Sequence, residues 1–173
     1  MATPDSLSLN ARYVHGHARD RFLHALFVRP QAREAVFTLY ALEAELAHVH
    51  TAVSEEMIAY IRFAWWYEAL EALYNRQVRR GQPVIEALAL LVEAGHLPQL
   101  LLLAIVEDYR YAYPELPASG PQHVDVAVAA LLEALSPESI TAWRKAGKRI
   151  AAHRARYGTK ANAWLVLKLW VGL

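Results

Sequence analysis

Two Glu-x-x-His units carry residue types that bind metal ions. One runs from Glu45 to His48 and the other from Glu93 to His96. Two such units, with one glutamate from each of two further helices, build the di-metal carboxylate site of some helical bundles. Gly95 lies inside the second unit and favours a helix end there, which would turn its side chains away from a shared site. We expect no metal, and the di-metal carboxylate bundle is the second alternative among the functional hypotheses.

The other acidic pairs are not spaced like a diphosphate-binding cluster. Holding Mg²⁺ against a diphosphate requires several carboxylates on one helix face. The chain offers Glu68 with Glu71, and Glu107 next to Asp108. We interpret both pairs as solvated helix faces. The sequence also lacks a phosphate-cradling glycine loop and a Gly-x-Ser-x-Gly motif, so no catalytic residue is assigned.

The composition excludes several kinds of site. The chain has 173 residues and no cysteine, which rules out thiolate zinc sites, iron–sulfur clusters, disulfide scaffolds and cysteine nucleophiles. A formal net charge of +1 argues against nucleic acid as a partner. The first ten residues have no basic region followed by an apolar run, so we expect no secretory signal. We therefore expect a protein that is not secreted.

The elements that must position these residues are helices. Pro30, Pro83 and Pro98 suit first helical positions, and Ser136-Pro137-Glu138 is a further start signal. One predicted helix begins after Ser54 and runs to about residue 77. It carries six apolar residues at mixed spacing: Ile58, Ile61, Trp65, Trp66, Leu70 and Leu73.

These signals predict an all-α fold, a single-domain helical bundle. No alternating strand pattern is present, and 55% of the residues are hydrophobic. We expect a flexible N-terminal segment over 1–16 and a helical domain over 17–173. A linker-like break is expected near 114–122, where three prolines and a glycine cluster.

The last third of the chain holds a candidate contact surface. A basic helix is predicted over about 138–157, and an apolar, tryptophan-bearing segment follows it. Basic side chains next to a tryptophan-bearing apolar segment suit a protein partner, in a hetero- or homo-oligomer, or a peripheral membrane contact. The residues proposed for this surface are Arg149, Arg156, Trp164, Lys168 and Trp170.

The segment from Arg19 to about Tyr74 resembles the squalene/phytoene synthase family. It contains Leu-Tyr-Ala-x-x-Ala-Glu-Leu over 39–46, Val-Ser-Glu-x-Met over 53–57 and Arg-x-x-Trp-Trp-x-x-Ala-Leu over 62–70. Within the family it looks closest to the branch that includes complex I assembly factors. The resemblance implies an isoprenoid synthase fold, here truncated. It also implies two aspartate-rich motifs that would hold Mg²⁺ against a prenyl diphosphate.

The chain departs from the family at those motifs. The first set of aspartates would fall near Ala47, His48 and Thr51, none of which is a carboxylate. After the proline-rich break, Asp125 stands alone among valines and alanines. Without these acids the leaving diphosphate lacks its metal clamp. The chain also looks shorter than complete family members.

We therefore lean towards a non-catalytic protein that acts by binding another protein, with lipid as a further candidate ligand. An example is an assembly factor or accessory subunit of a membrane-associated complex. No cofactor is expected on this hypothesis, and we expect the protein in the cytoplasm or mitochondrial matrix, or peripheral to a membrane. The first alternative is a prenyl diphosphate-using transferase, or an isoprenoid-binding protein, with non-standard motifs. Mg²⁺ would be its cofactor only if it is an enzyme.

The resemblance also gives the aromatic residues a candidate role. In active relatives such side chains surround long isoprenoid chains, and here they would line a residual apolar pocket or form ordinary core. The candidate pocket residues are Phe22, Phe37, Tyr40, Phe63, Trp65 and Trp66.

Overall fold

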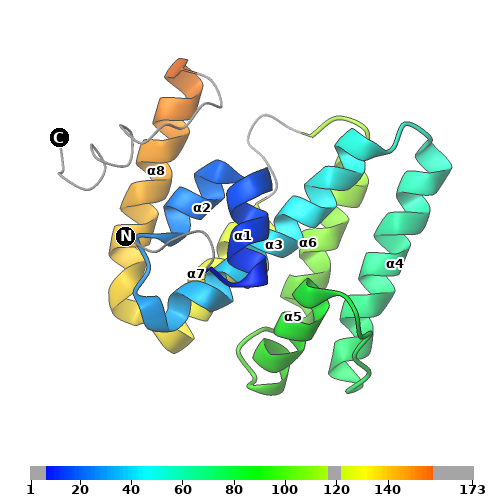
Figure 1. Cartoon of the computed structure of the whole chain (residues 1–173), viewed down its shortest axis with the longest axis horizontal. Coiled ribbons are helices and arrows are strands. Elements are labelled where there is room, and N and C mark those ends of the chain that lie inside the picture. Colours follow the sequence, from blue (N-terminus) through cyan, green and yellow to red (C-terminus); the bar gives the residue numbers. More distant parts are fainter. Residues whose placement is uncertain (1–6, 117–121, 158–173) are drawn as a thin grey trace.

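The chain folds around one central helix. The computed structural model describes residues 7–116 and 122–157. Within these ranges α3 (Pro30–Ala52) packs against six other helices and lies in the middle of the molecule (Figure 1). The six are α1 (Leu9–His17), α2 (Arg19–Ala25), α4 (Glu56–Tyr74), α5 (Pro83–Glu93), α6 (Gln99–Ala112) and α7 (His123–Leu135).

The last described helix is α8 (Ile140–Tyr157), which follows a 3-10 turn at Pro137–Ser139. Figure 1 shows α8 at one end of the molecule and α4 at the other. The described residues form helices and no strand, so the predicted all-α class is confirmed. None of these helices is both long and apolar enough to cross a bilayer.

Local signals explain where several helices begin. Pro30 and Pro83 occupy first-turn positions of α3 and α5, as predicted, because a helix start has no partner for their missing N–H. The Gln82 side chain accepts a hydrogen bond from the Val84 N–H at 2.9 Å. After α5, Gly95 adopts a φ of +74°, a left-handed conformation that glycine reaches without a steric penalty.

The N-terminal region differs from the expectation. A flexible segment was expected over 1–16, but α1 occupies Leu9–His17. The Ser8 hydroxyl caps it by accepting from the Ala11 N–H at 3.0 Å. Ala11 and Val14 are almost completely buried against the core. The helix was missed because its one buried stripe is short and the rest of it is polar, so packing on α3 stabilises it more than propensity does.

The expected break near 114–122 lies between α6 and α7. Residues 117–121 fall outside the described ranges. Helices on both sides contribute to the same hydrophobic core, with Ile105 and Val106 from α6 and Val128 and Leu131 from α7. The two sides therefore share one core.

A closed ring of hydrogen bonds ties α8 to α2 and α3. The Trp143 indole N–H donates to the Tyr40 hydroxyl oxygen at 2.9 Å. The Tyr40 O–H then donates to His24 Nδ1 at 2.9 Å, and His24 Nε2–H donates to the Trp143 carbonyl at 2.8 Å. The first and last of these directions follow because an indole N–H only donates and a carbonyl only accepts. Burial lowers the pKa of His24 to about 4, so its imidazole is neutral near pH 7 and Nδ1 accepts from the Tyr40 O–H.

Candidate functional site

Arg21 bridges the acidic groups that α3 and α7 turn towards each other. Its guanidinium contacts the carboxylate of Glu43 on α3 and that of Asp125 on α7, each at 2.7 Å. Burial opposes the charge of Arg21, but the two carboxylates outweigh it and raise its pKa well above the ordinary value. Burial and the Glu43 carboxylate also raise the pKa of Tyr109. Arg21 therefore engages both acids, Glu43 inside the fold and Asp125 at its edge, where the Asp125 side chain is 49% exposed.

The positions expected to carry the first aspartate-rich motif lie near the end of α3. Ala47, His48 and Thr51 occupy them, and His48 and Thr51 are exposed. The Thr51 hydroxyl donates to the His48 carbonyl at 3.1 Å, a local contact within the helix. These side chains hold no carboxylate that could coordinate a divalent cation.

A cavity of about 220 Å³ lies between this part of α3 and the facing side of α4. It combines an aromatic wall with charged side chains from both helices. Its lining residues are Glu45, His48, Val49, Arg62, Trp65, Trp66 and Gln82.

The six candidate pocket residues are distributed over different environments. Phe37, Tyr40 and Phe63 are buried in the common core. Phe22 is half-buried and stacks on Phe37, with ring centroids 5.3 Å apart. Successive helical residues differ by about 100°, so α4 turns Trp66 inward while Trp65 stays 38% exposed. Of the six, only the two tryptophans line the 220 Å³ cavity.

The di-metal alternative is wrong for the part of the chain that the structure describes. There, no three His, Asp or Glu side chains come close enough to hold a metal ion together. Glu45 and His48 line the α3–α4 cavity, while Glu93 lines a separate one beside α5. The second unit is split because α5 ends at Glu93, and His96 follows the glycine turn.

The candidate contact surface at the C-terminus is only partly described. Arg149 and Arg156 lie on α8. On the same helix, Arg154 forms an ion pair with Asp20 of α2 at 2.8 Å. Trp164, Lys168 and Trp170 lie outside the described residues.

An apolar surface on α4 was missed by sequence reasoning. It consists of Met57, Ile58, Tyr60, Ile61 and Trp65, each at least 38% exposed, and is called the α4 outer face below. Ile58, Ile61 and Trp65 had been counted in one apolar set with true core residues of this helix. One sequence signal could have revealed this surface: α4 is apolar around most of its circumference. A helix that packs on one side only needs apolar residues on that side alone.

The helical architecture and the family motifs on α3 and α4 define the class of this protein. The chain belongs to the squalene/phytoene synthase family, whose model matches residues 14–112. The expected family resemblance is thereby confirmed.

One characterised human protein is similar to part of this chain. The human protein "NADH dehydrogenase (ubiquinone) complex I, assembly factor 6" is 32% identical over 87 residues. The match covers 50% of this chain and 26% of the human protein, so it spans about a quarter of that relative's length. No solved structure matches the chain.

Proposed function

We propose that the protein acts without catalysis, as an accessory factor that binds other proteins during assembly of a membrane-associated complex. The observation that carries this proposal is the Arg21 bridge between Glu43 and Asp125. It places a cation where α3 and α7 turn carboxylates towards each other. Carboxylates committed to an internal arginine are poor ligands for Mg²⁺.

The residues at the expected first motif support the same proposal. Ala47, His48 and Thr51 replace the carboxylates that would clamp a diphosphate. The relative's name describes an assembly factor of complex I. On this proposal the chain works in the cytoplasm or mitochondrial matrix, at the surface of the complex that it serves.

The cavity beside α4 favours protein binding over isoprenoid binding. Its volume of about 220 Å³ is below the roughly 300–1,000 Å³ usual for small-molecule sites. Glu45, His48 and Arg62 also contribute polar groups to its wall, which a long hydrocarbon chain would have to desolvate. Isoprenoid binding therefore stays the alternative, and the experiments below must distinguish it from protein binding.

Deletion of the gene tests the proposal. Loss of the protein should lower the amount of assembled membrane NADH dehydrogenase complex on native gels, while its separate subunits are still made. The wild-type gene should restore the complex. A normal amount of complex in the deletion strain would refute the assembly role.

A parallel assay tests the absence of catalysis. The purified protein, supplied with Mg²⁺ and farnesyl or geranylgeranyl diphosphate, should release no pyrophosphate above a protein-free blank. Release that depends on the protein would establish the transferase alternative. Native mass spectrometry of the same sample would show an isoprenoid if one is bound.

A further inference from the structure

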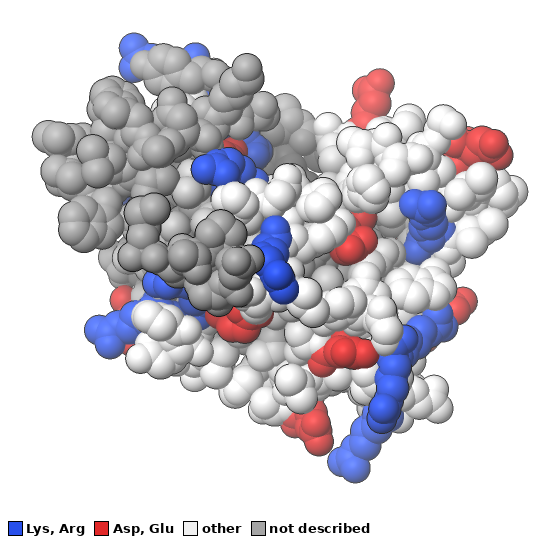
Figure 2. Space-filling model, in the orientation of Figure 1, with Lys and Arg blue, Asp and Glu red and all other residues white. Residues whose placement is uncertain are grey.

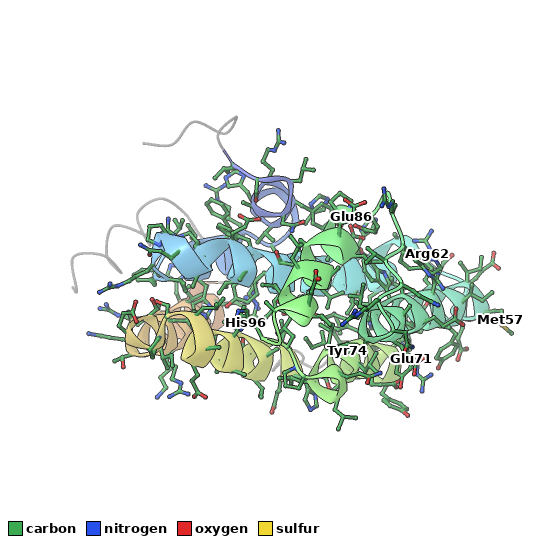
Figure 3. The ribbon with its side chains drawn as sticks, turned by 90° about the horizontal axis from the view of Figure 1, so that it is seen from below. Met57, Arg62, Glu71, Tyr74, Glu86 and His96 are labelled. Atoms are coloured by element: carbon green, nitrogen blue, oxygen red, sulfur yellow. The ribbon has the colours of Figure 1, made fainter. Side chains whose placement is uncertain are left out.

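The α4 outer face has the geometry of a helix–helix contact. Met57, Ile61 and Trp65 follow one another at intervals of four residues, so they form a continuous ridge on one side of the helix. Met57 and Ile61 are 71% and 61% exposed. Figure 3 shows Met57 at the outer edge of the molecule, away from the core. The opposite side of α4 is the buried one, with Phe63, Trp66 and Leu70.

The two ends of this ridge carry opposite charges. Glu55 and Glu56 are exposed at the start of α4. At the other end, the Arg79 guanidinium lies 5.4 Å from the centre of the Trp65 ring, with exposed Arg80 beside it in sequence. Arg79 also contacts Glu68 at 3.3 Å. With the exposed Arg76 and Arg80, the arginines at that end outnumber Glu68 and the exposed Glu71. Along the edge where α4 lies, Figure 2 shows an acidic group at the upper end and a run of basic groups, with an acidic group beside them, at the lower end.

We propose that the α4 outer face is a self-association surface, on which a second copy of the chain packs its own α4 in antiparallel orientation. A two-fold axis beside Ile61 places that residue against its own copy and Met57 against the partner's Trp65, a sulfur–aromatic contact. Ridges spaced four residues apart interlock at a crossing angle of about −50°.

The charge distribution along α4 favours a second copy of the chain as the partner and an antiparallel orientation of the two helices. Antiparallel packing brings Glu55 and Glu56 of one copy towards Arg79 of the other. Parallel packing would instead bring acid against acid and arginine against arginine, which is repulsive. The acidic start of α4 also disfavours an anionic membrane surface. The inference goes beyond the assembly role, because it concerns the purified chain alone.

Sedimentation of the full-length chain tests the proposal. The wild-type protein should be a dimer at tens of micromolar, and Ile61→Glu should weaken dimerisation at least tenfold while the helical circular dichroism is unchanged. Leu100→Glu is the matched control, because Leu100 is 84% exposed on another helix. The Leu100→Glu variant should stay dimeric. A monomeric wild type, or a dimer that Ile61→Glu does not weaken, would overturn the proposal.

Disulfide trapping gives a second test that does not depend on a destabilising charge. The chain contains no cysteine, so a single introduced thiol reports one contact. Under mild oxidation Ile61→Cys should form a disulfide-linked dimer at least tenfold faster than Leu100→Cys. Equal rates would place the contact elsewhere and overturn the proposal.

Glu56→Lys tests the charge argument separately. It should weaken the dimer at least threefold, because it places a cation near the partner's Arg79. Glu115→Lys makes the same charge change at an exposed position outside α4 and should leave the dimer unchanged. Equal effects of the two variants would overturn the antiparallel orientation.

Discussion

Acidification should destabilise the fold through His24. In the ring of hydrogen bonds Nδ1 of the neutral imidazole accepts from Tyr40, and burial lowers the pKa of His24 from 6.5 to about 4. In the unfolded chain the same imidazole takes up a proton near its ordinary pKa of about 6.5. Between these values the unfolded chain binds more protons than the folded one, so stability falls as the pH falls.

The size of this effect follows from the two pKa values. One pKa unit corresponds to about 1.4 kcal/mol, so the full loss is about 3 kcal/mol and is complete below the folded-state pKa. About 2 kcal/mol of it should already be lost between pH 7 and pH 5. Neighbouring charges act in opposite directions, since Arg21 lowers and Asp125 raises the pKa of His24.

Urea unfolding of matched variants isolates this contribution. His24→Gln keeps a side-chain N–H but cannot titrate, so it should lose about 2 kcal/mol less than the wild type between pH 7 and pH 5. His48→Gln removes an exposed histidine and should follow the wild type. Parallel pH profiles for His24→Gln and the wild type would refute the reasoning.

Three further predictions concern buried contacts, and urea unfolding at neutral pH measures each of them. Tyr40→Phe leaves the donor and the acceptor that its hydroxyl joins without partners, and should cost about 2–4 kcal/mol; a loss under ~1 kcal/mol would contradict this. Gly147→Ala should destabilise the fold, because the new Cβ would lie 2.9 Å from a ring atom of His24. At Gly16 a new Cβ meets open space, so Gly16→Ala should stabilise the helix by about 0.5–1 kcal/mol. Stability changes of the same sign for both variants would be inconsistent with the packing. Arg21→Met leaves Glu43 buried without its cation and should cost about 3–5 kcal/mol, and an unchanged midpoint would show that the network is not structural.

Local sequence signals were sufficient for much of the fold. The prolines at the starts of α3 and α5 act within one turn, and the glycine after α5 acts through its own φ. Such signals require no knowledge of distant residues. The family motifs on α3 and α4 are likewise contiguous stretches, which is why the family was predictable from the residues alone.

The candidate site was less predictable, because its contacts join residues far apart in the chain. Arg21 meets Asp125 across 104 positions, and His24 meets the Trp143 carbonyl across 119. No local pattern marks these pairs. The two Glu-x-x-His units had suitable spacing, but the turn that follows Glu93 splits the second unit.

The sequence by itself determined an all-helical chain, its family and the residues that stand where carboxylates were expected. Only the tertiary structure decided which apolar residues of α4 are core and which are surface. Phe63 and Trp66 meet neighbouring helices, while Ile61 faces solvent. The physical reason is that hydrophobicity is a property of the residue, whereas burial depends on which elements pack against it.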